Sequence, residues 1–344
     1  MFKETIKNLH SFTVKLVALL CVSGFSESFA QNMAPPSGDS NQTESEPKNR
    51  FDSILSEAYR PKEGDGILTF TYVTASLTDA VVKTYSFSTQ TTSKLASVTA
   101  VGSYLNLSYK YAIDENVNIG FSLNDALGKK IEYNYTASAK NSGYADFTSN
   151  RSGMEEPSIY LDYVLKRTDN LLVVLDLGFS PKTGDTSDTN SLRGGSVARF
   201  GFHIYRAAGK CEYTFGLGAE TLSTRTGKSG TSTIESTGGN KLTGTLGVNL
   251  FLSEKTSLLL GGAYQRTAAS TDTITPQTMK FENTDYGTST ISAVVGHTIS
   301  KDLSMHLGAS VVTTETQSSS TTTSKTTQEL SYSYGLGLGL KLGF

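Results

Sequence analysis

The stretch Gln328-Glu-Leu-Ser-Tyr-Ser-Tyr-Gly-Leu-Gly-Leu-Gly-Leu-Lys-Leu-Gly-Phe344 at the carboxyl end of the chain decides the fold. Every even-numbered residue from Leu330 onward is apolar or aromatic, whereas the odd-numbered ones are Ser, Gly or Lys. Because side chains alternate between the two faces of a β-strand, the stretch predicts one strand with a wholly apolar face. Such a face would make a soluble edge strand prone to aggregation, whereas a transmembrane β-barrel needs it. A strand of a soluble sandwich is the alternative.

The chain from Gly66 onward divides into further segments with the same alternation. The predicted strands lie near 66–76, 97–112, 116–136, 157–167, 171–181, 195–207, 211–224, 241–252, 256–267, 285–299, 303–316 and 328–344. Every second connection is short and polar, and the others are long and rich in Ser, Thr and Gly. The long connections include 182–194, 225–240, 268–284 and 316–327. This asymmetry is typical of bacterial barrels, so we expect an all-β fold: a transmembrane antiparallel up-and-down β-barrel of about 12 strands, within a range of about 10 to 14.

Residue spacing across the short turns also predicts how neighbouring strands pair. The expected outward pairs are Leu165 with Val173, Tyr163 with Leu175, Leu161 with Leu177, Leu250 with Leu258 and Val295 with Leu307. These apolar residues fall on the same face across each turn, as hairpin pairing requires. An even number of strands places both termini at the short-turn rim, which is the periplasmic side of such barrels.

The first thirty residues have the features of a secretory signal peptide. Three lysines precede the apolar run 16–22, and Ser28-Phe-Ala30 has the small residues of a cleavage site. The apolar run is too short to span a membrane as a helix. Once the signal peptide is removed, Cys211 is the one remaining cysteine, so an intramolecular disulfide is not possible.

Residues 31–65 connect the signal peptide to the barrel. Up to about Asn49 the segment is dominated by Pro, Ser, Asn, Gln and Glu, which predicts a disordered periplasmic tether. Between Arg50 and Tyr59 apolar residues share one helical face, and Pro61 ends the pattern. A short helix that plugs the barrel and a loosely ordered leader both agree with this pattern. The expected segments are a signal peptide at 1–30, the tether with its short helix or plug at 31–65 and the barrel at 66–344.

Charged residues gather on the strand face that looks into the lumen. The candidates for a lumen constriction are Asp162, Asp176, Arg199, Glu220, His203 and Lys341. Asp162 and Asp176 are equally far from Asp169, so they should be opposed across that turn. Two adjacent carboxylates disfavour joint ionisation unless a cation is near, and Arg199, which should pair with Glu220, is the expected cation. The group forms either a charged constriction that selects solutes or a salt-bridge network that only braces the wall.

Motifs for catalysis or cofactor binding are absent from the sequence. After removal of the signal peptide, His203, His297 and His306 are the only histidines, and a Gly-x-Ser-x-Gly motif is missing. Metal-ligand spacing among His, Cys and carboxylates is missing as well. The balance of 30 basic and 32 acidic residues gives no nucleic-acid footprint. We therefore expect no enzyme, no cofactor, no metal and no nucleic-acid partner.

A strand pair and the loop that follows it carry a family resemblance. The segments are Glu156-Pro-Ser-Ile-Tyr-Leu-Asp-Tyr163, Leu171-Leu-Val-Val-Leu-Asp-Leu-Gly-Phe179 and Ser180-Pro-Lys-Thr-Gly-Asp185. They resemble a family of outer-membrane channels associated with phenol-degradation pathways. In that family a strand pair leads to a Pro-Thr-Gly-Asp loop, whereas here Lys182 separates Pro181 from Thr183. The resemblance implies passage of small solutes of aromatic or apolar character.

The closing strand carries a second resemblance. A chain that stops on an aromatic residue at the end of such a strand is similar to bacterial outer-membrane β-barrels, in which this strand carries the assembly signal. The resemblance implies that the signal comprises Phe344, Leu342, Leu340 and Tyr334. It also implies that the barrel-assembly machinery, outer-membrane lipid and lipopolysaccharide are partners.

Together these features predict a protein of the Gram-negative outer membrane with both termini in the periplasm. The expected function is a porin-like channel or facilitator for the passive passage of small solutes through a narrow barrel lumen. The alternative is a structural or surface-interaction barrel without significant transport, whose Ser/Thr-rich loops present a binding face.

Overall fold

The structure is a computed structural model of the chain. It describes residues 64–141, 143–154, 157–168, 170–181, 195–229, 232–276, 279–300 and 302–343. The expected signal peptide, nearly all of the expected tether and the terminal Phe344 lie outside these residues. A helix long and apolar enough to cross a membrane is absent from the described part of the chain.

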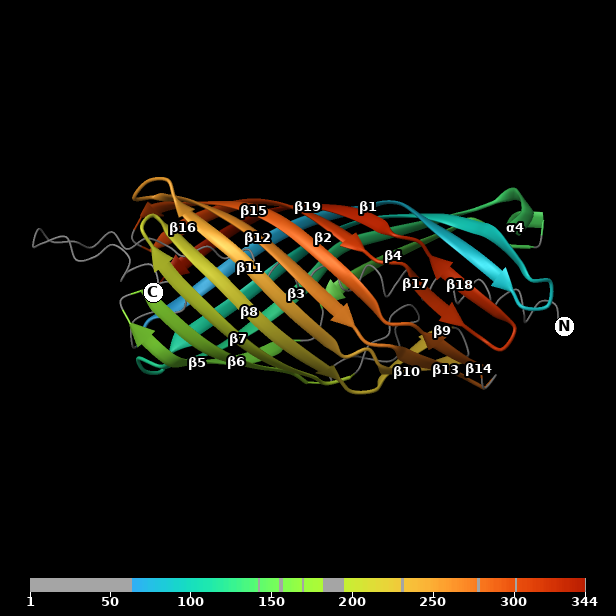
Figure 1. Ribbon diagram of the computed structural model, residues 1–344, viewed down its shortest axis with the longest axis horizontal. Coiled ribbons are helices and arrows are strands. Elements are labelled where there is room, and N and C mark those ends of the chain that lie inside the picture. Colours follow the sequence, from blue (N-terminus) through green and yellow to red (C-terminus); the bar gives the residue numbers. More distant parts are fainter. Residues whose placement is uncertain are drawn as a thin grey trace, which may run out of the picture.

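Twelve antiparallel strands form a closed barrel (Figure 1). They are β1 (Gly66–Ser86), β2 (Thr91–Ala112), β3 (Val117–Tyr135), β5 (Ser158–Thr168), β6 (Leu171–Ser180), β7 (Val197–Ala208), β8 (Cys211–Leu222), β11 (Lys241–Phe251), β12 (Thr256–Thr267), β15 (Tyr286–Ser300), β16 (Leu303–Thr314) and β19 (Ser331–Gly343). β1 pairs with β2 on one side and with β19 on the other, so the sheet closes on itself. The expected up-and-down barrel and its strand count are confirmed.

The strand registers follow the expected hairpins with one exception. The confirmed pairs are Tyr163 with Leu175, Leu161 with Leu177, Leu250 with Leu258 and Val295 with Leu307. Leu165 does not face Val173, because the register shifts between Val164 and Lys166 and Lys166 takes that place. An irregularity of this kind inserts an extra residue into one strand and redirects the side chains beside it.

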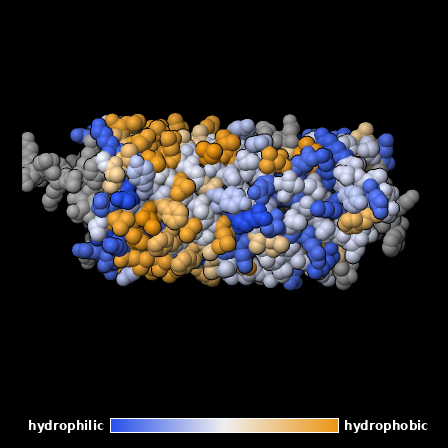
Figure 2. All heavy atoms as spheres, in the orientation of Figure 1, coloured by the Kyte–Doolittle hydropathy of each residue, from blue (hydrophilic) through white to orange (hydrophobic). Residues whose placement is uncertain are grey.

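The outward faces of the barrel strands are apolar. On β19 the exposed side chains are Tyr332, Tyr334, Leu336, Leu338 and Leu340, and the residues between them are buried. Figure 2 shows apolar atoms concentrated over the half of the molecule that carries the short turns, with polar atoms over the other half. An apolar band of this kind matches the lipid-facing surface of an outer-membrane barrel. The polar half therefore projects beyond the membrane.

Beyond the apolar band the sheet continues as an extension built from long strands and short hairpins. β1, β2 and β3 run into it. Its other elements are α4 (Ala137–Asn141), β4 (Phe147–Met154), β9 (Arg225–Ser229), β10 (Ser232–Gly238), β13 (Ser270–Thr275), β14 (Met279–Asn283), β17 (Gln317–Ser320) and β18 (Ser324–Gln328). The expectation of long loops at 225–240, 268–284 and 316–327 is therefore wrong, because these segments satisfy their backbone polar groups by pairing with adjacent strands. The expected loop 182–194 lies outside the described residues.

The interior of the extension holds two apolar clusters. The larger one comprises Leu77, Ala80, Val82, Leu95, Ala96, Val98, Ala100, Ile131, Tyr133, Tyr135 and Ala139. Tyr144 stacks on Tyr135 with 5.1 Å between ring centroids. The smaller cluster joins Ile234, Ile274 and Phe281 from the hairpins β10, β13 and β14. Burial of this apolar surface stabilises hairpins whose outer faces are mostly Ser and Thr.

The wall of the barrel extends farther from the short turns on one side, the high side, than on the other, the low side. In the extension, strand pairing runs β4–β3–β2–β1–β18–β17–β14–β13–β10–β9, and within the described residues β4 and β9 pair on one side only. β5, β6, β7 and β8 end lower, near Ser158, Ser180, Val197 and Leu222. The ends of these four strands that lie away from the short turns, called their outer ends below, therefore form the low rim of the lumen.

Candidate functional site

A cavity of about 400 Å³ lies inside the barrel. Its wall includes Ile67 and Lys341 near the short-turn ends of β1 and β19. It also includes Ser158 on β5 and Thr290 on β15, toward the opposite ends of those strands. The cavity therefore extends along most of the membrane-embedded length of the barrel.

Much of the cavity wall is polar but uncharged. The inward side chains on β1, β2, β3, β11, β12 and β15 include Thr69, Thr71, Asn106, Ser108, Ser122, Asn124, Thr243, Thr245, Gln265, Thr288 and Thr290. Hydroxyls and amides offer hydrogen bonds to a polar solute, whereas an apolar solute would leave them without partners. The wall also includes Ile67, Phe200 and Leu217, so polar and apolar groups both line the cavity.

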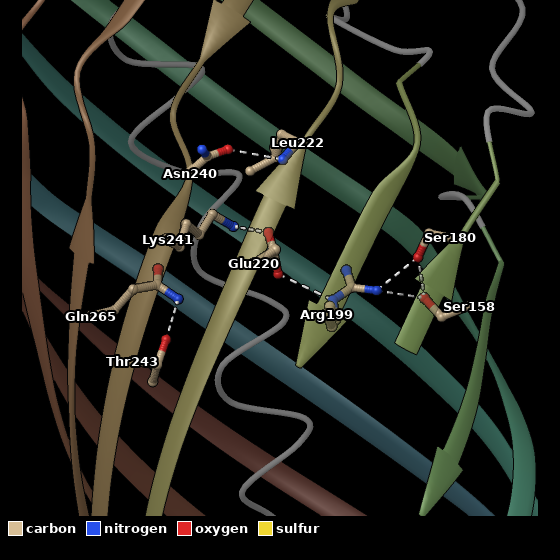
Figure 3. Close-up of polar contacts among 9 residues, drawn as sticks. All are labelled: Ser158, Ser180, Arg199, Glu220, Leu222, Asn240, Lys241, Thr243 and Gln265. Atoms are coloured by element: carbon tan, nitrogen blue, oxygen red, sulfur yellow. Dashed lines mark hydrogen bonds and ion pairs between the residues drawn. The ribbon is translucent and has the colours of Figure 1, made fainter. Parts of the chain in front are cut away.

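A row of polar side chains crosses the outer ends of the low-side strands and their neighbours, and we call it the outer belt (Figure 3). It comprises Ser158, Ser180, Arg199, Glu220, Lys241, Thr243 and Gln265. Arg199 and Glu220 are register partners, as expected, and Arg199 Nε donates to Glu220 Oε2 at 3.1 Å. Lys241 Nζ lies 3.0 Å from Glu220 Oε1. Each oxygen of Glu220 therefore has its own cation.

Arg199 also organises two serines of the outer belt. Its Nη1 donates to Ser180 Oγ at 2.7 Å and to Ser158 Oγ at 3.1 Å, and the two hydroxyl oxygens are 2.6 Å apart. One serine hydroxyl donates to the other, so the accepting hydroxyl can still donate a hydrogen bond to another group. Gln265 Nε2 donates to Thr243 Oγ1 at 3.2 Å, so the Thr243 hydroxyl accepts this bond and can still donate one. The outer belt thus offers hydrogen-bond donors to a solute.

A second group lies closer to the short turns, and we call it the inner cluster. It comprises Lys110, Asp162, Asp176 and His203. Asp162 and Asp176 are register partners, as expected. Lys110 forms an ion pair with Asp162, and His203 Nε2 lies 2.7 Å from Asp176 Oδ2. The expectation that Arg199 neutralises the two aspartates is wrong, because Arg199 lies at the outer end of β7 and is bound within the outer belt.

Glycines make room for the inner cluster. A Cβ atom on Gly216 would lie 2.6 Å from His203 Nδ1, and one on Gly201 would lie 3.2 Å from His203 Nε2. The imidazole therefore lies against bare backbone of β7 and β8. Gly120 likewise lies beneath the ring of Tyr160, whose hydroxyl donates to a backbone carbonyl of β2 at 3.1 Å. Large side chains are thus held flat against the wall, and the cavity remains open beside them.

The remaining predicted residues lie apart from both groups. Lys341 lines the cavity near the short-turn end of β19 and is 8% exposed. Leu340 and Tyr334 lie on the outer apolar face, and Leu342 is half-buried near the short-turn rim. Phe344 is outside the described residues. The role of these outward residues in assembly stays a prediction.

Sequence reasoning did not select Lys241 as a site residue. Lys241 is the first residue of β11 and directly opposes Glu220 on β8. The two strands are separated by residues 223–240, and a register can be counted reliably only across a short turn of defined length. Ser158 and Ser180, which face each other at the outer ends of β5 and β6, were missed because serines on a strand carry no distinctive spacing.

Comparisons with known proteins agree with this fold. No family model and no curated protein matches the chain. The COG4313 outer membrane channel from Pseudomonas putida F1 is similar over 88% of this chain and 100% of its own, with 13% identity and a TM-score of 0.54. The TodX deltaS2S3 mutant monoaromatic hydrocarbon channel is less similar, with 12% identity and a TM-score of 0.46 over 92% of this chain and 98% of its own. The outer membrane protease OmpT from Escherichia coli has 9% identity and a TM-score of 0.37 over 83% of this chain and 98% of its own. The chain has the fold of a bacterial outer-membrane β-barrel.

Proposed function

We propose that this barrel is an outer-membrane channel for the passive passage of small solutes. The observation that carries the proposal is the cavity of about 400 Å³ along the inside of a closed barrel, lined by hydroxyls, amides, paired charges and apolar groups. Its small volume lies at the lower end of the range for ligand pockets, so large solutes are excluded. The channel function of the similar protein from Pseudomonas putida F1, as its name states it, supports the same reading.

The proposal includes a location and an orientation. The apolar band lies in the outer membrane, the short turns and both termini face the periplasm, and the extension faces outward, as in barrels with this asymmetry of connections. Lipid and lipopolysaccharide contact the band, and the assembly machinery recognises the closing strand. The proposal involves no catalytic step, cofactor or metal.

The plug expected within residues 31–65 stays a prediction, because all but the last two of these residues lie outside the described part of the chain. The described chain enters β1 at the inner mouth of the lumen, because Gly64 N donates to Ala112 O at the short-turn end of β2. Glu212 and Asn249 point inward near the same end and are 2% and 1% exposed. Glu212 Oε2 and both polar side-chain atoms of Asn249 have no hydrogen-bond partner in the described part of the chain. A polar segment seated in the mouth would supply such partners.

Planar-bilayer recordings test the channel and the plug together. The mature chain should conduct, and a variant lacking residues 31–60 should conduct more strongly because its inner mouth is clear. Absence of current from both proteins would refute the channel. Equal conductance would refute the plug alone.

The alternative function is a structural or surface-interaction barrel. One observation favours it: the extension is a paired sheet with its own apolar clusters, so it could present a fixed surface to a partner. The two functions differ in the bilayer experiment, because only the channel requires current.

A further inference from the structure

We propose that Gly218 on β8 is the position at which the barrel wall limits the width of a passing solute. This role rests on the proposed channel function and identifies a residue that determines the size selectivity of the channel. Three features of the described residues support it: the bare backbone beside the cavity, the open space over Gly218 and the fixed side chains around it.

Four glycines of neighbouring strands line the cavity: Gly178 on β6, Gly201 on β7, and Gly216 and Gly218 on β8. Three of them make room for a large side chain. A Cβ atom on Gly178 would lie 3.1 Å from Arg199 Cβ. One on Gly201 would lie 3.2 Å from His203 Nε2, and one on Gly216 would lie 2.6 Å from His203 Nδ1. The packing of Arg199 and His203 therefore explains the glycines at these three positions.

The glycine at position 218 has no such explanation. A Cβ atom there would lie 3.6 Å from Phe200 O and 3.9 Å from Thr243 Cβ, which are ordinary van der Waals distances. The registers of β8 with β7 and with β11 run without a shift, so Gly218 does not mark a bulge. A glycine inside a strand weakens it and often marks a bulge or the close approach of a ligand. Within the described part of the chain, the remaining role of Gly218 is to leave room for a solute.

The cavity reaches the main chain of the wall at this height. It borders Phe200 and Leu217 as well as Gly218, although Phe200 and Leu217 point to the outer face and are exposed there. Gly201 and Gly218 are register partners, so two residues without side chains lie next to each other on β7 and β8. A side chain added at position 218 would therefore project into the cavity.

Two pairs of polar side chains lie on either side of Gly218 along the barrel. Toward the low rim, Arg199 Nε donates to Glu220 Oε2 at 3.1 Å (Figure 3). Toward the short turns, His203 Nε2 lies 2.7 Å from Asp176 Oδ2. Hydrogen bonds that involve a charged group are stronger than those between neutral groups. These side chains are therefore held in place and do not turn aside to widen the path.

The wall beside these pairs is fixed as well. Thr243 on β11 is a register partner of Gly218, and its Oγ1 accepts a 3.2 Å hydrogen bond from Gln265. On β2 and β3, Asn106 Nδ2 donates to Asn124 Oδ1 at 2.6 Å, and both residues border the cavity. The width of the path at this height therefore depends on the residue at position 218.

Single-channel conductance in planar bilayers tests the role of Gly218 on the mature, full-length chain. Conductance in potassium chloride should fall stepwise from the wild type through Gly218→Ala and Gly218→Val to Gly218→Leu, with a loss of at least threefold in the last variant. In proteoliposomes, Gly218→Leu should lower the swelling rate in glucose relative to that in arabinose by at least twofold. Both sugars are neutral, so this ratio reports size rather than charge.

Gly244→Leu is the matched control. Gly244 on β11 is the register partner of Leu217, and a Cβ atom there would have Leu217 Cδ2 on the outer face as its nearest neighbour, at 4.0 Å. The same side chain is thus added to the neighbouring strand outside the lumen. This variant should keep the wild-type conductance and swelling ratio.

A thiol at the same position keeps the test decisive if Gly218→Leu assembles poorly. Gly218→Cys in a Cys211→Ser background can be recorded first and then treated with a bulky methanethiosulfonate reagent in the bilayer chamber. The current should drop at least threefold, whereas Gly244→Cys in the same background should not respond. Equal conductance across the Gly218 variants, or an equal loss in the Gly244 variants, would overturn the role of Gly218 and leave the channel in place. A wild-type protein without any current would overturn the channel and this role with it.

Discussion

Lys110 on β2 forms an ion pair with Asp162 on β5, although β3 lies between these two strands. The residue of β3 that faces Lys110 is Gly120, which in turn faces Tyr160 on β5. Because Gly120 has no side chain, the ring of Tyr160 lies over it, and Lys110 Nζ lies 5.6 Å from the centroid of that ring. The ion pair can therefore form because β3 carries no side chain at Gly120. The side chain of Asp162 is 4% exposed, and Lys110 supplies its positive partner.

The first prediction concerns this pair. Lys110→Met should lower the free energy of unfolding by about 3–5 kcal/mol, because it leaves a buried carboxylate without its cation. Urea unfolding in detergent micelles, followed by tyrosine fluorescence, measures the loss. The double variant Lys110→Met/Asp162→Asn should recover most of it. Equal losses in the single and double variants would show that the charge pair is not the cause.

The same pair shows where sequence reasoning ends. The short turns fix the register of each hairpin, so the opposition of Asp162 and Asp176 could be counted from Asp169. The partner of Asp162 could not be found in this way. Lys110 lies two strands away, and only the bare backbone at Gly120 allows the contact. An ion pair that reaches across an intervening strand depends on the side-chain volume at that strand rather than on residue spacing along the chain.

The second prediction concerns the two faces of one strand. Leu217 and Gly218 are neighbours on β8, with Leu217 on the outer face at 52% exposure. Gly218 faces the lumen, where a Cβ atom would meet nothing closer than 3.6 Å. Leu217→Arg should cost about 2–4 kcal/mol of stability in lipid, since it places a charge near the middle of the apolar band. Gly218→Ser should change the urea midpoint little. Equal tolerance at both positions would contradict the lipid-facing band.

The Ser/Thr-rich hairpins of the extension were wrongly predicted as loops because their strands lack an apolar face. Strand prediction depends on an apolar face that alternates with a polar one. β17 and β18 contain only Ser, Thr, Gln and Lys, so neither face stands out from a polar loop. Their pairing with each other, and with β14 and β1, is what orders them. Threonine favours strands, but that preference alone does not distinguish a strand from a connection.

The third prediction concerns orientation. In a Cys211→Ser background, Ser138→Cys places a thiol on α4 in the extension, and Glu254→Cys places one in the short turn after β11. A membrane-impermeant maleimide should label the first variant on intact cells. It should label the second only after the outer membrane is opened. The reverse pattern would place the extension in the periplasm.

The last prediction uses a buried carboxylate in the extension, outside the apolar band. Asp272 on β13 is fully buried, and its Oδ2 accepts a 2.8 Å hydrogen bond from Asn283 Nδ2. Burial raises the pKa of Asp272 above its usual range, and the hydrogen bond from Asn283 offsets only part of that effect.

The sign of the pH effect follows from this shift. Because the folded state holds the proton more tightly than the unfolded state, the contribution of Asp272 to stability is fully present below its unfolded pKa and is lost as the pH rises through its folded pKa. Asp272→Asn mimics the protonated form at every pH. The variant should match the wild type near pH 4 and unfold at a higher urea concentration near pH 8. Parallel curves of urea midpoint against pH for the two proteins would show that Asp272 does not carry the effect.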